Sequence, residues 1–142
     1  MSIVLTFGAG ALRQCRFAIS PLFETADAIR TLNHPGREGF HLPWQRRVRE
    51  VLPELGIGPL FSLLPHATYN PDFLSPPPDG PFTEITDDIA RVRATPAERV
   101  AVELAALLTT HPDPRRARAQ IALLGDDPEQ VRDRAADLLE RA

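Results

Sequence analysis

The chain of 142 residues contains no lysine, and all 16 of its basic residues are arginine. The absence of lysine excludes a Schiff-base lysine and the phosphate-binding lysine of a P-loop. The basic residues stand against 19 acidic ones, which gives a formal net charge of −3 at pH 7. No uniform positive field is therefore available to bind nucleic acid or an anionic membrane.

Cysteine is equally scarce, because Cys15 is the only one. A single cysteine cannot form an intrachain disulfide, so a disulfide-stapled scaffold is excluded. The N-terminus lacks both a basic stretch and an apolar run of the length that a membrane span needs. We therefore expect a cytoplasmic protein that has no membrane partner.

The residues that are present, 43% hydrophobic and 25% charged, are typical of one soluble globular domain. Helical spacing of the apolar residues predicts a mainly α fold of about five or six helices, or an α+β fold with one short N-terminal strand. That strand would cover Ile3 to Phe7, and the rest of the chain offers it no partner. We predict one domain over residues 1–142 and leave open whether it is a natural short protein or a fragment of a longer one.

Prolines divide the chain. Five of the 15 lie between residues 67 and 81, which excludes regular helix and central strand there. We predict a lobe at 1–66, an extended proline-rich connection at 67–82 and a helical lobe at 83–142. Tyr69, Phe73 and Leu74 are expected to anchor the connection. It is interpreted as a semi-rigid linker, with a proline-rich ligand for a partner's groove as the alternative.

Several helix starts carry capping residues followed by proline. They are Ser20-Pro21, Asp113-Pro114 and Asp127-Pro128, and Thr95-Pro96-Ala97-Glu98 has the pattern of a capping box. The first of these helices should end near Asn33. Another helix is predicted from Leu42-Pro43, ended or kinked by Pro53, with an apolar face formed by Trp44, Val48, Val51, Leu52 and Leu55.

Residue types that carry chemistry are present without the spacing that chemistry requires. His34, His41, His66 and His111 show no metal-ligand spacing, and most lie beside prolines in predicted turns. The pairs Asp87-Asp88 and Asp126-Asp127 are interpreted as solvated or capping residues. The sequence therefore predicts no catalytic residue, no metal, no cofactor and no enzyme activity.

Arginines cluster on the helix predicted from Leu42. Arg46, Arg47 and Arg49 are candidate DNA contacts if this helix is the second one of a helix-turn-helix. The connection from Asn33 to His41 is longer than the turn of about 3–4 residues which that motif uses. A solvated or interface face is therefore favoured.

Four segments carry a resemblance to a known family. They are CRFAISPLFET at 15–25, HLPW at 41–44, YNPDFL at 69–74 with the prolines that follow, and RVRATP at 91–96. Together they resemble the N-terminal region of actinobacterial transcription regulators in which a domain precedes an ArsR-like winged helix. The resemblance implies a domain that dimerises, senses or positions, while a C-terminal winged helix, absent from this chain, contacts DNA.

The first hypothesis is therefore an N-terminal regulatory and dimerisation domain of a winged-helix-type regulator, whose partner is a second copy or the winged-helix module and which touches DNA only indirectly. Its candidate packing and association residues are Phe7, Phe17, Leu22, Trp44, Phe73, Leu138 and Leu139. An open apolar face at Leu138 and Leu139 would favour this hypothesis.

The alternative hypothesis is a stand-alone helical module that binds a small apolar ligand or a protein partner, with Trp44, Phe61 and Tyr69 as pocket walls.

Overall fold

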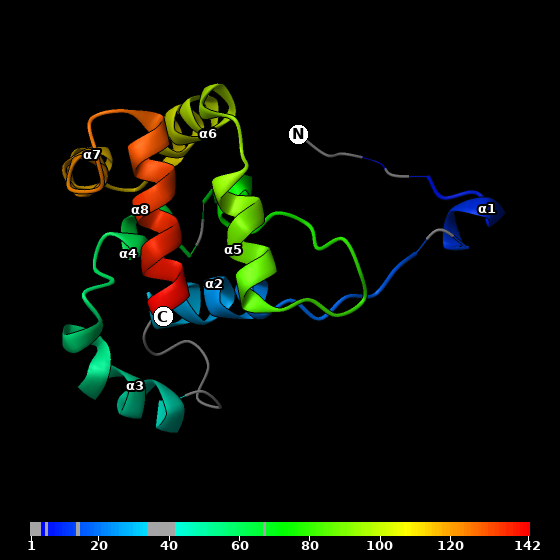
Figure 1. Cartoon of the computed structure of the whole chain (residues 1–142), viewed down its shortest axis with the longest axis horizontal. Helices are drawn as coiled ribbons and strands as arrows, with labels where there is room; N and C mark the ends of the chain where they lie inside the picture. The colour runs from blue at the N-terminus through cyan, green and yellow to red at the C-terminus, as the bar shows by residue number, and fades with distance from the viewer. Residues whose placement is uncertain (1–3, 5, 14, 34–41, 67) are drawn as a thin grey trace.

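The structure is mainly helical, as the sequence predicts (Figure 1). It is a computed structural model that describes residues 4, 6–13, 15–33, 42–66 and 68–142. Within these ranges the elements in chain order are α1 (Ala9–Leu12), α2 (Pro21–Leu32), α3 (Leu42–Leu55), α4 (Leu60–Leu63), the 3-10 helix η2 (Asp72–Leu74), α5 (Ile85–Arg93), α6 (Ala97–Thr110), α7 (Pro114–Ala122) and α8 (Pro128–Arg141).

The predicted N-terminal strand is not formed where the structure describes it. Val4, Thr6 and Phe7 lie outside any strand, and Ile3 and Leu5 fall outside the described residues. The β-type pairing in the described ranges is one isolated parallel bridge, between Ile19 and Phe82. The described part of the chain is therefore α rather than α+β.

Three of the predicted helix starts are confirmed. The Ser20 hydroxyl accepts a hydrogen bond from the backbone N–H of Phe23 at 3.1 Å, and α2 begins at Pro21. Asp113 and Asp127 cap α7 and α8 in the same way, at 3.0 and 2.9 Å from the N–H groups of Arg116 and Gln130. Each cap satisfies a donor that the first helical turn leaves free.

The predicted capping box at Thr95 is wrong. α6 begins at Ala97, and the Thr95 hydroxyl donates to the backbone oxygen of Arg91 at 3.3 Å instead. Thr95 follows the end of α5 so closely that its side chain bonds back to that helix. Pro53 lies inside α3, which ends two residues later at Leu55.

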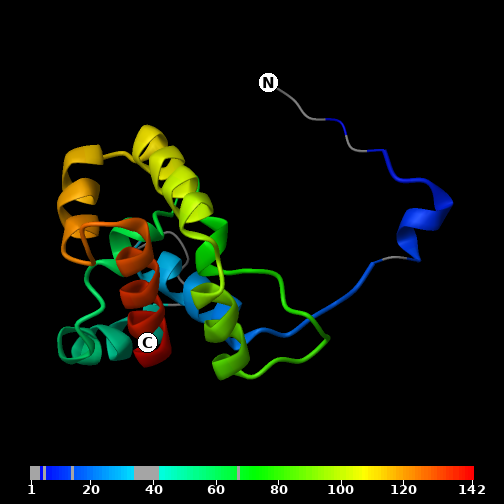
Figure 2. The ribbon, with the colours of Figure 1, turned by 45° about the horizontal axis from the view of Figure 1, so that its top comes forward.

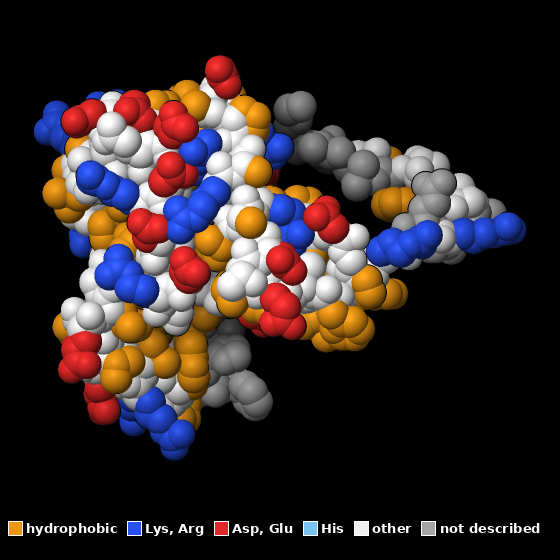
Figure 3. Space-filling view, in the orientation of Figure 1, with side chains coloured by type: hydrophobic (Ala, Val, Ile, Leu, Met, Phe, Trp, Pro, Cys, Tyr) orange, Lys and Arg blue, Asp and Glu red, His pale blue; other side chains and the backbone are white. Residues whose placement is uncertain are grey.

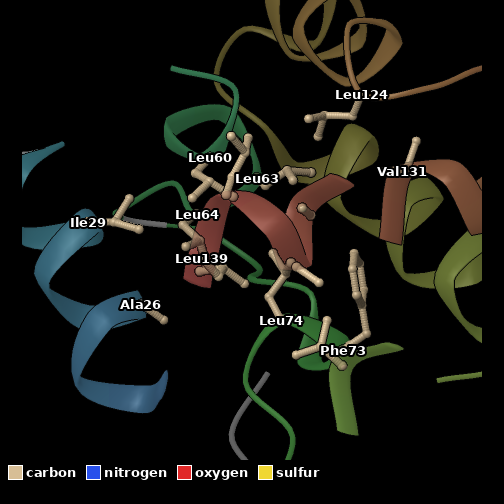
Figure 4. Packing of buried hydrophobic residues seen from close by; sticks show 14 of the residues in the cluster. Ala26, Ile29, Leu60, Leu63, Leu64, Phe73, Leu74, Leu124, Val131 and Leu139 are labelled. Atoms are coloured by element: carbon tan, nitrogen blue, oxygen red, sulfur yellow. The ribbon is translucent and has the colours of Figure 1, made fainter. Parts of the chain in front are cut away.

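Helix α8 lies at the centre of the core and packs against α2, α4, α5, α6 and η2 (Figures 1 and 2). Figure 4 shows buried side chains that converge on it from segments far apart in the sequence. Those that are at most 1% exposed include Leu22, Leu60, Leu63, Phe73, Val92, Leu107 and Leu139. One hydrophobic cluster thus joins residues on both sides of the proline-rich connection.

The proline-rich connection is anchored where the sequence predicts. Phe73 is 1% exposed, Leu74 is fully buried, and Tyr69 packs partly against the core. The carboxylate of Glu103 on α6 accepts a hydrogen bond from the backbone N–H of Phe73 at 2.7 Å. This bond satisfies the backbone N–H of Phe73, which has no partner in a regular helix or sheet because the surrounding segment is rich in proline.

The first residues of the chain behave differently from the rest. We call the described residues among 4–19 the arm, and those among 20–142 the body. The arm carries α1 and projects away from the body in both ribbon views (Figures 1 and 2). It meets the body where Ile19 pairs with Phe82.

Candidate association surface

The arm exposes large apolar side chains. Phe7 is 70% exposed, Phe17 91% and Ile19 61%. Full burial of such a side chain is worth about 1.5–3 kcal/mol relative to water. Burial of these side chains against another surface would therefore be favourable.

The charges of the arm are all positive. Arg13 and Arg16 are its only charged residues in the described ranges, and both are exposed. The Arg16 guanidinium donates from Nη1 to the backbone oxygens of Arg13 and Cys15, each at 2.9 Å. The free thiol of Cys15 is exposed between them.

The root of the arm is fixed by backbone hydrogen bonds. The N–H of Ile19 donates to the oxygen of Pro81 at 2.8 Å, and the N–H of Thr83 donates to the oxygen of Ile19 at 3.4 Å. These bonds set the point and the direction in which the chain leaves the body.

The buried carboxylate of Asp88 on α5 forms hydrogen bonds with residues next to the root of the arm. It is 0% exposed and accepts hydrogen bonds from the hydroxyls of Ser20 at 2.7 Å and Thr83 at 3.1 Å, and from the N–H of Leu22 at 3.4 Å. It also forms an ion pair with Arg91, so its charge is compensated. The expectation that Asp88 is solvated or a capping residue is thus wrong, because the fold brings three donors from other segments to it.

Burial by itself would raise the pKa of Asp88. The hydrogen bonds from Ser20, Thr83 and Leu22, together with the charge of Arg91, outweigh that effect and hold the pKa below its ordinary value. The carboxylate is therefore ionised in the folded protein at neutral pH. It acts as a fixed acceptor that joins the start of α2 to α5.

An apolar patch surrounds the root of the arm. Phe82 is 75% exposed and Phe23 is 57% exposed, and Ile19 lies against Phe82 in the parallel bridge. Figure 3 shows hydrophobic side chains gathered where the arm joins the body and again over α3. Apolar surface of this kind commonly marks an interaction site.

The second gathering belongs to a groove between α2 and α3. Its volume is about 330 Å³ and its residues are Glu24, Thr25, Ala28, Ile29, Leu32, Trp44, Val48, Leu52, Leu55, Ile57 and Ala142. The predicted apolar face of α3 is only half covered, since Trp44 is 39% and Val51 is 47% exposed. The groove is therefore apolar inside and open to solvent.

Polar contacts hold the two helices of the groove together. Buried Gln45 donates from its side-chain amide to the backbone oxygen of Thr31 at 3.3 Å, and Arg49 donates to that of Leu32 at 3.4 Å. These bonds satisfy carbonyl groups at the C-terminal end of α2. They fix α3 against α2 without filling the space between the helices.

The acidic residues at the rim differ in their partners. Asp27 pairs with Arg30 at 3.4 Å, and both line an adjoining hollow that shares Glu24, Ala28 and Trp44 with the groove. Glu24 makes no ion pair with any other residue that the structure describes. One carboxylate at the mouth of the groove is thus available to a cation.

The predicted packing and association residues divide into two groups. Leu22, Phe73 and Leu139 are 1% exposed and Leu138 is 7% exposed, so all four lie in the core. The open face expected at Leu138 and Leu139 does not exist, because α2, α4, α5 and α6 cover α8. The exposed group comprises Phe7, Phe17 and Trp44.

The three predicted pocket walls do not share a cavity among those lined by described residues. Trp44 lines the groove, whereas Phe61 lines a separate hollow of about 380 Å³ that includes His66, His111 and Arg116. Tyr69 lines neither of these two. Its pKa is raised, first by burial and then by the charges of Glu103 and Asp72.

The arginines proposed as DNA contacts lie on the solvent side of α3. Arg46, Arg47 and Arg49 are exposed, and Arg49 donates a hydrogen bond to the backbone at the end of α2.

Two of the four histidines, His34 and His41, fall outside the described residues. No group of three or more His, Cys, Asp or Glu side chains in the described ranges is placed to hold a metal ion. In the same ranges, every helix is too short or too polar to cross a bilayer.

Sequence reasoning missed the two buried acidic groups. Asp88 meets Ser20 across 68 positions of sequence, and Glu103 meets Phe73 across 30. The only local signals were the arginines one turn away, Arg91 for Asp88 and Arg99 for Glu103. Such pairs are common on exposed helix faces and so could not have indicated burial.

No protein-family model matches the chain, and no match was found among curated proteins or among solved structures.

Proposed function

We propose that this chain is the regulatory and self-association domain of a cytoplasmic bacterial transcription regulator of the winged-helix type. The resemblance of four segments to the N-terminal region of ArsR-like regulators supports the regulatory part. The observation that carries the self-association is the projecting arm, on which Phe7 and Phe17 are 70% and 91% exposed.

Self-association follows from the cost of exposing this surface. Phe7, Phe17, Ile19 and Phe82 lie on the arm or at its root and are all more than half exposed. A second copy offers the same apolar patch, and a two-fold arrangement uses it on both subunits at once. Aromatic residues are enriched at the centre of such interfaces.

The charge distribution supports an indirect relation to DNA. Residues 1–82 carry equal numbers of arginine and acidic residues, and residues 83–142 carry a net charge of −3. A surface that binds DNA needs a concentrated positive patch. DNA contact would therefore belong to a winged-helix module that acts with this domain.

Sedimentation over a range of concentrations tests the association. We expect a dimer, and a Phe7→Ser/Phe17→Ser variant whose dimerisation is weakened by roughly tenfold or more. Val102→Ser is the matched control, because Val102 is 69% exposed on α6 and lies outside the arm. A folded protein that stays monomeric at high concentration would refute the association.

A DNA titration tests the indirect role. We expect weak binding to duplex DNA that does not change in an Arg46→Ala/Arg47→Ala/Arg49→Ala variant. Tight, salt-dependent binding that this variant loses would show instead that α3 reads DNA directly.

A second candidate function is capture of a small apolar ligand. The groove between α2 and α3 favours it, because about 330 Å³ lies within the range of ligand pockets and its interior is apolar. The emission of Trp44, the single tryptophan, would report such a ligand.

A further inference from the structure

We propose that the arm of one copy docks in the α2–α3 groove of a second copy, so that two copies exchange arms. This inference rests on the proposed self-association and names the surface that receives the arm. Its basis is that one chain presents both a segment with exposed aromatic side chains and a groove lined largely by apolar residues, each described among the residues that the structure covers.

The placement of the two parts favours exchange over folding back. Figures 1 and 2 show the arm and α3 on opposite sides of the body. The hydrogen bonds of Ile19 with Pro81 and Thr83 fix the root of the arm to the body on the side away from α3. Extended chain gains about 3.3–3.6 Å per residue and helix about 1.5 Å, so an arm over residues 4–18 that keeps α1 can span up to about 45 Å and reach a neighbour.

The chemistry of the arm matches that of the groove. Phe7 and Phe17 supply the apolar part, and the groove offers Ile29, Trp44 and Val48. Offset or edge-to-face contact of a phenyl ring with the half-exposed indole would add to the burial. The small side chains of Thr25 and Ala28 on the α2 wall leave room for an incoming ring.

The charges match as well. The arm carries Arg13 and Arg16 and no acidic residue, while Glu24 at the mouth of the groove lacks an ion-pair partner among the described residues. A guanidinium beside Glu24 would complete that pair, and one over the indole of Trp44 would make a cation–π contact. A second copy therefore supplies both the apolar and the cationic groups that the groove can accept.

The chain provides its own pair of probes, since Cys15 on the arm and Trp44 in the groove are the only cysteine and tryptophan. One copy is Trp44→Phe with an energy-transfer acceptor on Cys15. The other copy is Cys15→Ser and keeps Trp44. In a mixture that sedimentation shows to be dimeric, we expect the acceptor to reduce Trp44 emission. Undiminished emission in such dimers would overturn the exchange while leaving self-association intact, whereas absence of dimers would refute the proposed function itself.

A complementation experiment gives an independent result. The groove variant is Val48→Glu, and the arm variant is Phe7→Ser/Phe17→Ser. Each alone should be monomeric, and an equal mixture should form a heterodimer, because one intact arm still meets one intact groove. Arg47→Glu is the control, since Arg47 is exposed on α3 outside the groove.

Circular dichroism would first establish that each variant is folded. A Val48→Glu protein that is folded and dimerises like the unsubstituted chain would overturn the inference. So would a groove that binds a small apolar compound equally well in the arm variant and in the unsubstituted dimer, because an arm seated there must compete with it.

Discussion

Phe73 and Phe17 are the same residue type in opposite surroundings, at 1% and 91% exposure. Phe73 lies in η2, where the backbone is held by Glu103 and α6 and α8 cover the ring. Phe17 lies outside any helix or strand and follows a helix of four residues. The body has a buried hydrophobic core because its helices pack on one another, whereas Phe7, Phe17 and Ile19 of the arm are all exposed. Under the proposed function, stability belongs to the body and association belongs to the arm.

The largest expected effect is that of Phe73→Ala, at about 3–5 kcal/mol of unfolding free energy, because it removes a buried ring and leaves a cavity. Phe17→Ala should change the free energy by about 0.5 kcal/mol or less in dilute protein, since that ring makes no core contact. Urea unfolding of both variants measures the contrast. Equal losses would mean that the arm is part of the core.

The buried carboxylate of Asp88 gives the next effect. Asp88→Asn keeps an acceptor but removes the charge that compensates Arg91, and we expect a loss of about 3 kcal/mol. Asp79→Asn is the matched control, because Asp79 pairs with the same arginine at 3.0 Å but its side chain is 84% exposed. The control should lose less than about 1 kcal/mol. If the two variants are equally stable, the network at the arm's root is not structural.

Two glycines, Gly125 in the body and Gly10 in the arm, differ in the space around them. A Cβ on Gly125 would lie 2.4 Å from the Cβ of Gln130, so Gly125→Ala should cost about 1–3 kcal/mol. A Cβ on Gly10 of the arm would meet nothing within 4 Å. Gly10→Ala should therefore be neutral or slightly stabilise α1. Thermal unfolding distinguishes these outcomes, and a neutral Gly125→Ala would show that the turn before α8 can adjust.

The smallest expected effect is one of pH. The pKa of Asp88 is lowered in the folded protein, so its contribution is fully present above the unfolded pKa near 4 and is lost as pH falls through the folded value. One group changes the unfolding free energy by at most about 1.4 kcal/mol per pH unit. Urea midpoints of the unsubstituted chain should fall faster below pH 4 than those of Asp88→Asn. Parallel curves would contradict the lowered pKa.

Local signals in the sequence predicted the elements of the body well. Ser20, Asp113 and Asp127 each cap the helix that follows because the cap and the N–H groups it satisfies lie within one turn. The capping box at Thr95 failed because its hydroxyl donates back to the backbone oxygen of Arg91 in α5 and caps no N–H group of α6.

The candidate site could be predicted only in part. Hydrophobic spacing indicated the apolar face of α3, but spacing cannot tell a face that is covered by the same chain from one that is left open. Which helices pack together decides that Leu138 and Leu139 are buried and that Trp44 is partly exposed. The same packing decides which groups donate hydrogen bonds to Asp88.

The central place of α8 has a consequence for synthesis. The helix that covers α2, α4, α5 and α6 is the last of them to leave the ribosome. Until residue 141 has emerged, the apolar faces of the earlier helices have no common partner, and the nascent chain holds an unfinished core. Folding of the body must therefore follow translation of α8, and the aromatic arm, which is made before the helices of the body, is exposed until then.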